Sequence, residues 1–148
     1  MYRHILAATD GSESANKAIR HAAALAKTTG ARLTIVNVTQ MWSSLDIAQA
    51  AEAGVTNPVG EYEAMAAKSA ERVLAAAKAV AAADGTTCDT VHIQDRAPAE
   101  GIIAAARDKG CDLIVMGTHG RRGLGRLLLG SQAAEVLTTS KIPVLVVR

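Results

Sequence analysis

Hydrophobic positions along the first part of the chain alternate between short apolar runs and stretches with helical spacing. The run at residues 3–9 is mostly apolar and ends at Asp10-Gly11, which predicts a buried strand that closes in a turn. Small apolar residues then recur every three or four positions until Gly30, so a helix is expected there, capped by Ser12 or Ser14. Residues 31–38 are apolar again and predict a second strand.

The rest of the chain continues the alternation of helices and strands. In chain order, the pattern predicts a long helix, an outer strand, a helix, a strand, a helix and an edge strand, at 58–83, 87–94, 98–109, 112–117, 131–140 and 143–147. Four consecutive apolar residues within 112–117 imply burial on both faces, so this strand is expected inside the sheet. Pro143, at the start of the last strand, suits a sheet edge.

The segment between the second strand and the long helix is the least regular part of the pattern. Residues 39–57 have no strong periodicity beyond a possible short helix at 45–53, and connections of this length are often functional. Either a lid over a site or an ordinary loop fits this segment. The long helix that follows is expected to bury a stripe made of Tyr62, Met65, Ser69, Val73, Ala76, Ala77 and Val80.

This order of elements predicts an α/β fold with a doubly wound, five-stranded parallel sheet, Rossmann-like, in the strand order 3-2-1-4-5. Strand order then reverses between strands 1 and 4, and ligands of such sheets bind beyond the carboxyl ends of the strands at that point. Two segments should meet in this crevice, residues 9–11 and residues 117–120.

Composition supports one domain over residues 1–148 and narrows the class of ligand. Hydrophobic residues make up 49% of the chain but aromatic residues only 2%, so Ala, Val, Leu and Ile must fill the core. The net charge of +2 gives no reason to expect general affinity for nucleic acid or membranes. Cys88 and Cys111 form no CxxC pair, which disfavours zinc or redox chemistry.

A cytoplasmic location is expected, because the N-terminus lacks the pattern of a signal peptide and no apolar run approaches the ~18 residues of a membrane span.

A glycine-rich loop links the strand at 112–117 to the next helix. It runs from Gly117 to Ser131, where the helix begins, and a helix N-terminus carries about half a positive charge and unpaired N–H groups. Glycines let backbone amides approach an anion, Ser131 offers a hydroxyl to a phosphate or to Mg²⁺, and Arg121, Arg122 and Arg126 add positive potential. The loop therefore predicts phosphate binding, although neither the G-x4-G-K-[ST] nor the dinucleotide G-x-G-x-x-G motif occurs.

The spacing of this loop is instead G-x2-G-x9-G-[ST], and here the sequence resembles the universal stress protein family. The resemblance spans almost the whole chain. It rests on four segments, His-Ile-Leu-Ala-Ala-Thr-Asp-Gly-Ser-Glu at 4–13, Leu-Thr-Ile-Val-Asn-Val at 33–38, Asp-Leu-Ile-Val-Met-Gly-Thr-His-Gly at 112–120 and Ile-Pro-Val-Leu-Val-Val at 142–147.

The resemblance implies an ATP site, with Mg²⁺ accompanying the nucleotide, and a homodimer formed through strand 5. It places Asp10 beside the adenosine, the backbone of Val38 at the adenine edge, and Gly130, Ser131 and Gln132 at the β- and γ-phosphates. The other implied nucleotide-binding residues are Met116, with Gly117, His119 and Gly120 lining the ribose and phosphates. Ala8 and Gln132 depart from the family pattern, which usually has Pro and a small apolar residue at those positions.

Three functions therefore stay open at the level of sequence. The first is a regulatory ATP-binding protein, the second a slow ATP hydrolase in which Asp10 or Ser131 helps to position metal or water, and the third a nucleotide-free dimer that acts through its sheet edge. Individual residues have structural alternatives as well. Asp10 could cap the first helix together with Glu13, and His119 could be a surface imidazole without chemistry.

Overall fold

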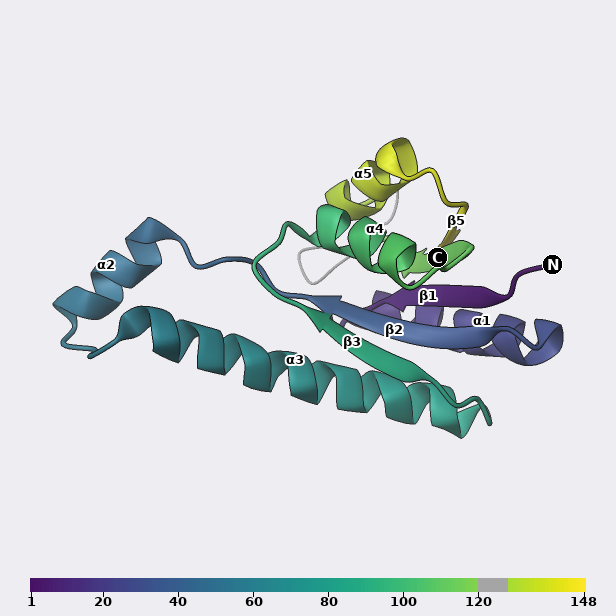
Figure 1. The fold of residues 1–148 in the computed structure, drawn as a ribbon, viewed down its shortest axis with the longest axis horizontal. Coiled ribbons are helices and arrows are strands. Elements are labelled where there is room, and N and C mark those ends of the chain that lie inside the picture. Colours follow the sequence, from purple (N-terminus) through teal and green to yellow (C-terminus); the bar gives the residue numbers. More distant parts are fainter. Residues whose placement is uncertain (120–127) are drawn as a thin grey trace.

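The computed structural model describes residues 1–119 and 128–148, and it has the predicted α/β architecture (Figure 1). The strands are β1 (His4–Ala8), β2 (Arg32–Val38), β3 (Asp89–Ile93), β4 (Leu113–Gly117) and β5 (Val144–Val147). The helices are α1 (Glu13–Thr29), α2 (Ser44–Glu52), α3 (Pro58–Ala83), α4 (Pro98–Asp108) and α5 (Ser131–Thr139). All strand pairs are parallel and their order is β3-β2-β1-β4-β5, which confirms the predicted order 3-2-1-4-5. β3 and β5 form the edges, and β4 lies inside the sheet as expected.

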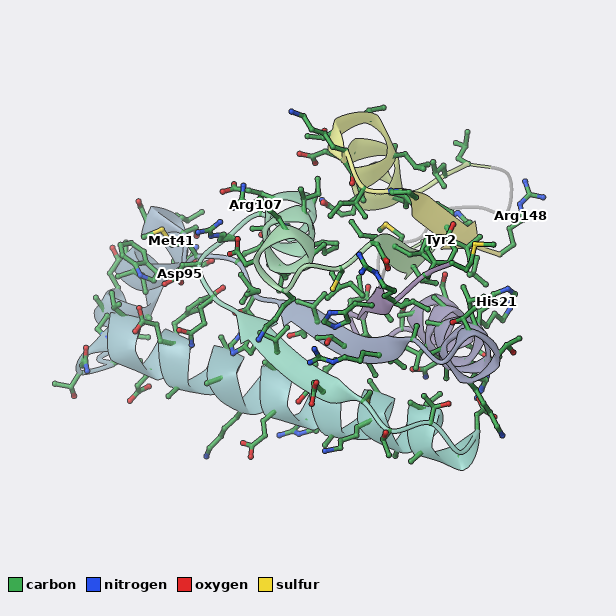
Figure 2. The ribbon with its side chains drawn as sticks, turned by 45° about the vertical axis from the view of Figure 1, so that its right-hand side comes forward. Tyr2, His21, Met41, Asp95, Arg107 and Arg148 are labelled. Carbon is green, nitrogen blue, oxygen red and sulfur yellow. The ribbon has the colours of Figure 1, made fainter. Side chains whose placement is uncertain are left out.

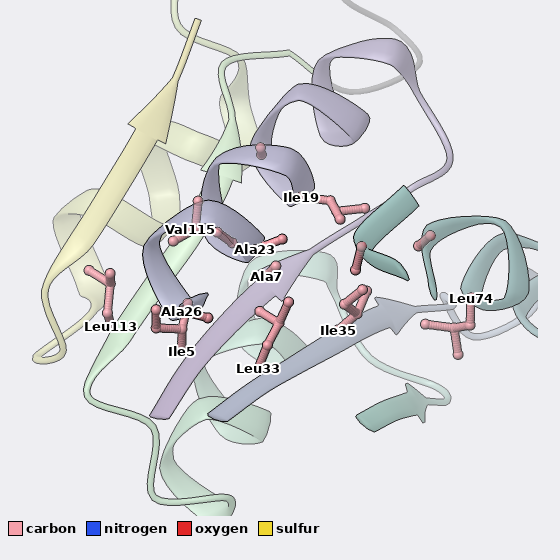
Figure 3. Packing of buried hydrophobic residues seen from close by; sticks show 14 residues of the cluster. Ile5, Ala7, Ile19, Ala23, Ala26, Leu33, Ile35, Leu74, Leu113 and Val115 are labelled. Atoms are coloured by element: carbon pink, nitrogen blue, oxygen red, sulfur yellow. The ribbon is translucent and has the colours of Figure 1, made fainter. Parts of the chain in front are cut away.

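Helices cover both faces of the sheet because successive side chains of a strand point to opposite faces. Ile5 and Ala7 of β1 pack with α1 and α3 on one face, whereas Leu6 of the same strand packs with α4 and α5 on the other. Figure 3 shows the first of these layers, in which Ala23 and Ala26 of α1 lie against the strands. Alanine in these positions brings the helix axis close to the sheet, so a core with few aromatic residues still packs tightly.

The first helix begins and ends with the signals that the sequence predicted. The Ser12 hydroxyl accepts a hydrogen bond from the N–H of Ala15 at 3.1 Å, and Gly30 ends the helix with a left-handed φ of 73°. The alternative role of Asp10 as the cap is wrong. Its carboxylate accepts from the N–H of Ser12 at 2.9 Å, and Asp10 lies two residues before the N-cap Ser12, so this bond closes a turn and does not cap the helix.

The buried stripe of α3 differs from the predicted one. Its buried residues are Ala70, Leu74, Ala77 and Ala81, and of the predicted stripe only Ala77 is among them, while the side chain of Met65 is 72% exposed. The physical reason is the position of the helix, since its first half extends past the strand ends together with α2 (Figure 1). Only the second half has a sheet to pack against. No helix in residues 1–119 and 128–148 has the combination of length and apolarity needed to cross a membrane.

Candidate functional site

A cleft of about 730 Å³ opens at the carboxyl ends of β1, β2 and β4. It lies where the strand order reverses between β1 and β4, the point at which parallel α/β sheets bind ligands. Predicted site residues from all three strand ends and from the start of α5 line it, namely Asp10, Val38, Met116, Gly117, His119, Gly130, Ser131 and Gln132. The predicted residue Gly120, and the arginines at 121, 122 and 126, lie outside the residues that the structure describes.

Backbone and side-chain hydrogen bonds hold the loop after β1 at the cleft. The N–H of Thr9 donates to the carbonyl of Val36 at 2.9 Å, and the side-chain amide of the buried residue Asn37 donates to the carbonyl of Thr9 at 2.8 Å. The Thr9 hydroxyl in turn accepts from the N–H of Gly11 at 3.1 Å. These contacts fix the path of the backbone on both sides of Asp10, so this residue is held at the cleft wall by its neighbours.

Two predicted phosphate-loop glycines are required by contacts within the protein itself. A Cβ on Gly130 would lie 2.7 Å from the carbonyl oxygen of Thr118, to which the Gly130 N–H donates at 2.6 Å. A Cβ on Gly117 would collide with the hydroxyl of Ser14 and lie 2.8 Å from the Ser14 carbonyl. Glycine at these two positions therefore lets the loop close at its base and lets α1 approach β4, in addition to any contact with a ligand.

His119 has one ring nitrogen bonded and one without a partner. Nδ1 lies 2.9 Å from the hydroxyl oxygen of Thr118, and the backbone N–H donates to the hydroxyl of Ser14 at 3.4 Å. Nε2 is buried and has no hydrogen-bond partner among residues 1–119 and 128–148. Buried polar atoms are nearly always bonded, so this exception, on a residue that lines the cleft, makes His119 a candidate for bonding a ligand. The alternative of a surface imidazole does not fit this environment.

The N-terminus of α5 faces the same cleft without a side-chain cap. Its cap residue, Gly130, offers no side chain, and no acidic residue lies in the first turn. Ser131, the first helical residue, is exposed, and it lines the cleft. The first N–H groups of the helix and the positive end of its dipole therefore face the cleft. No acidic side chain in that turn neutralises this positive charge, so the position favours an anion.

Gln132 has a structural role that the sequence did not suggest. Its side-chain oxygen accepts a hydrogen bond from the N–H of Ala99 at 3.1 Å. Ala99 lies in the first turn of α4, whose cap residue Ala97 has no capping side chain. The Gln132 carboxamide thus caps α4 from the first turn of α5 and ties the two helix N-termini together at the cleft. Its oxygen is engaged in the protein, which explains why a polar residue can occupy a position where the family usually has a small apolar one.

Sequence reasoning missed the walls that α3 and α4 contribute. Gln40, Tyr62, Pro98 and Ile102 also line the cleft. The phenol of Tyr62 donates to the carbonyl of Gln40 at 3.2 Å and so links the start of α3 to the exit of β2. Gln40 follows Val38 by two residues and could have been placed at the carboxyl end of the sheet. Tyr62 gave no such signal, because its distance from the strands depends on how α3 crosses the sheet.

Other ionisable groups in the described residues do not form a reactive centre. Burial raises the pKa of the Cys111 thiol to about 11, so it is protonated at neutral pH, and Cys88 and Cys111 are both free thiols. His92 bonds the hydroxyl of Thr39 through Nε2 at 2.7 Å, and burial lowers its pKa. Among residues 1–119 and 128–148, no group of three His, Cys, Asp or Glu side chains could hold a metal ion.

Comparisons with known proteins agree on one family. The universal stress protein family model matches residues 1–148. The chain is 37% identical over 155 aligned residues to the universal stress protein in the QAH/OAS sulfhydrylase 3′ region of Thermus aquaticus, with 100% of both chains covered. The solved structure of MJ0577 from Methanocaldococcus jannaschii is 29% identical with a TM-score of 0.79, over 99% of this chain and 96% of that one. A universal stress protein solved in complex with cAMP is 26% identical with a TM-score of 0.70, over 99% and 97%. The chain belongs to the universal stress protein family.

Proposed function

We propose that this chain is a regulatory ATP-binding protein whose nucleotide lies in the cleft at the carboxyl ends of β1, β2 and β4. The observation that carries the proposal is that one cleft is lined both by His119, whose Nε2 has no partner among the described residues, and by the N-terminus of α5, which has no side-chain cap. Both features favour an anion with several acceptor oxygens. The relative that was solved with cAMP supports an adenine nucleotide as the source of that anion.

The cleft offers different chemistry at its two ends. Asp10 and Val38, at the ends of β1 and β2, would receive the adenosine, and Met116 would contribute apolar surface. Gly117 and His119 would lie along the ribose and phosphates, and Gly130, Ser131 and the backbone of Gln132 would hold the β- and γ-phosphates. The protonated form of His119 Nε2 would donate a hydrogen bond to a phosphate oxygen. A cleft of about 730 Å³ falls within the roughly 300–1,000 Å³ of small-molecule sites.

Magnesium fits this site as a companion of the triphosphate. The described residues supply no cage of three or more acidic or histidine ligands. Mg²⁺ in nucleotide sites is commonly held by phosphate oxygens with one or two protein ligands and water, so such a cage is not needed. The exposed hydroxyl of Ser131, beside the proposed phosphate position, is the residue that we propose as its protein ligand.

Binding of nucleotide is the proposed chemistry, and its consequence for the protein follows from linkage. A ligand that binds only the folded chain stabilises it by about 2.7 kcal/mol at a free concentration one hundred times its dissociation constant. A cell's ATP level could in this way change the stability of the cleft loops and the surface that partners encounter.

The test is a calorimetric titration of nucleotide-stripped protein with ATP and Mg²⁺, repeated with Ser131→Asp. A carboxylate at the first position of α5 suits the helix dipole but repels phosphates, so we expect affinity to fall about tenfold or more while the fold is kept. Gly130 is a poorer target, since any side chain there would meet the Thr118 carbonyl and disturb the loop base. Released phosphate, measured in the same samples, tests the hydrolase alternative.

The matched control is Ser44→Asp. Ser44 is likewise the first residue of a nine-residue helix, α2, and does not line the cleft. It should leave ATP affinity unchanged. Absence of ATP binding to the unmodified protein at millimolar concentration, or equal affinity in Ser131→Asp, would refute the proposed site.

We also propose that two copies of the chain associate through β5. This strand is an edge, and its four residues are each only half-buried. Leu145 and Val147 pack toward one helical layer and Val144 and Val146 toward the other, so both faces carry apolar surface beside unpaired backbone groups. Light scattering at micromolar concentration should give the mass of a dimer, and Val146→Lys should shift it to the monomer. A monomeric unmodified protein would contradict this proposal.

A further inference from the structure

An aromatic side chain of α3 lines the cleft. Tyr62 lies in the second turn of this helix, whose second half packs on one face of the sheet, whereas Pro98 and Ile102 come from α4 on the other face. Among the described residues that line the cleft, Tyr62 is the only Phe, Tyr or Trp. The two walls therefore differ in character, with a flat ring on one and aliphatic side chains on the other.

The Tyr62 ring is restrained at both ends. Its Cα belongs to α3, and its hydroxyl donates a solvent-exposed hydrogen bond of 3.2 Å to the carbonyl of Gln40, on the segment that follows β2. The facing wall is closely packed, since Gly101 lets α4 approach β2 so closely that a Cβ there would lie 2.7 Å from a Val38 methyl. A ring restrained in this way loses less entropy on receiving a planar ligand than an unrestrained side chain does.

We propose that Tyr62 stacks on the base of the bound nucleotide and makes the cleft selective for purines. This inference rests on the proposed function and adds the residue that recognises the base. Every base has a π-face, but a purine presents the larger one, so stacking favours ATP over UTP. The phenol hydroxyl positions the ring through Gln40, and the ring itself contacts the base. Val38 and Ile102 supply the apolar surface on which the other side of the base rests.

The test compares ATP and UTP affinities of the full chain and two variants. Tyr62→Leu removes the aromatic face and should weaken ATP binding about 5- to 150-fold, the range that corresponds to one base–aromatic stack, with a smaller loss for UTP. Tyr62→Phe keeps the face and loses only the bond to Gln40, so its ATP affinity should stay within about threefold of the unmodified protein. The preference for ATP over UTP should therefore fall in the first variant and persist in the second.

The outcomes separate this inference from the proposed function. If the unmodified protein does not bind ATP, both fail. If it binds ATP and Tyr62→Leu binds ATP equally well, or loses ATP and UTP in the same proportion, the stacking role is wrong and the ATP site stands.

A second measurement does not depend on truncating the side chain. In a Trp42→Phe background, which removes the only tryptophan of the chain, Tyr62→Trp places a single indole at the proposed stacking position. Stacking on adenine should quench its fluorescence as ATP is added and less so with UTP. Unchanged fluorescence at saturating ATP would overturn the proposal.

Discussion

The side of the sheet where its strands begin, here called the amino edge, and the side where they end, the carboxyl edge, use the same kinds of polar residue to opposite effect. At the amino edge, the Asp112 carboxylate accepts from the N–H groups of Arg3 and His4 at 2.9 and 3.0 Å, and His4 Nε2 lies 2.8 Å from the Thr34 hydroxyl. At the carboxyl edge, His119 Nε2 is buried without a partner in the part of the chain that the structure describes, and the N-terminus of α5 lacks a side-chain cap. The Nε2 atom of one histidine is thus bonded within the protein, while the Nε2 atom of the other has no such bond among the described residues.

This difference separates residues that stabilise the fold from residues that are available to bind a ligand. Polar groups that bond each other in the folded state add to stability, because unfolding breaks these hydrogen bonds. A buried polar atom without a partner costs stability, and native proteins keep such atoms mainly at functional sites. We therefore expect substitutions at the amino edge to change stability without changing ATP affinity, and substitutions at the cleft to do the reverse.

The largest effect should come from Asp112→Ala. The variant leaves the N–H groups of Arg3 and His4 without their acceptor and loosens the start of β1, so we expect the free energy of unfolding to fall by about 2–3 kcal/mol. ATP affinity should not change, because Asp112 lies at the edge opposite the cleft. Urea denaturation and calorimetric titration measure the two quantities.

Asp108→Ala is the control for Asp112. Asp108 is an exposed acid near the same edge whose ion pair with Arg107, at 3.2 Å, is solvated, so its removal should change stability by well under 1 kcal/mol. Equal effects of the two variants would show that the carboxylate of Asp112 acts through general charge and not through its hydrogen bonds.

A paired histidine substitution should give the next largest effect. His4→Leu leaves the buried Thr34 hydroxyl without its partner, and we expect a loss of about 1–2 kcal/mol in the free energy of unfolding. His119→Leu removes Nε2, which has no partner among the described residues, but also the bond of Nδ1 to the part-buried Thr118 hydroxyl, so we expect a smaller loss of stability than for His4→Leu.

The same pair should separate in the opposite sense when ATP is titrated. His119→Leu should weaken ATP binding, since the proposed donor to a phosphate is lost, and His4→Leu should bind as the unmodified protein does. If His119→Leu destabilises the fold as much as His4→Leu, the carboxyl edge is built for stability and the comparison between the edges fails.

The sequence predicted the sheet order and part of the cleft lining, for reasons visible in particular residues. Strands and helices were found because apolar periodicity and the stops at Gly30 and Gly110 are local signals. The cleft residues were found because the end of each parallel strand meets the others at one edge, so Asp10 and Gly117 could be placed together from their positions along the chain.

What the sequence could not predict depends on contacts between elements far apart in the chain. No local pattern predicts the bond from the Ala99 N–H to the Gln132 side chain or the bond from the Tyr62 hydroxyl to the Gln40 carbonyl. The same is true of the His119 ring nitrogen that has no partner among the described residues. The buried stripe of α3 was misread because amphipathic spacing in an alanine-rich helix fits several faces. Leu74 is buried and Met65 is exposed because only the second half of α3 packs against the sheet. Figure 2 shows the same end of the molecule from another side, with Met41 and Asp95 marking the loops that follow β2 and β3.

The smallest effect that sharpens the comparison is the pH dependence of stability at the amino edge. Burial, together with the charge of Arg32, lowers the pKa of His4 below its usual 6.5, so the folded chain takes up a proton less readily than the unfolded chain. Stability contributed by neutral His4 is therefore complete above pH 6.5 and declines as pH falls from 6.5 toward the lower folded pKa. Burial lowers the pKa of His92 as well, so this residue also reduces stability as the pH falls.

The urea midpoint of the unmodified protein should decrease as the pH is lowered from 7 to 5.5. The midpoint of His4→Leu should decrease less, with the residual slope coming from His92. An identical slope in both proteins would mean that His4 accepts its proton in the folded state at no cost, and that its bond to Thr34 does not depend on a neutral ring.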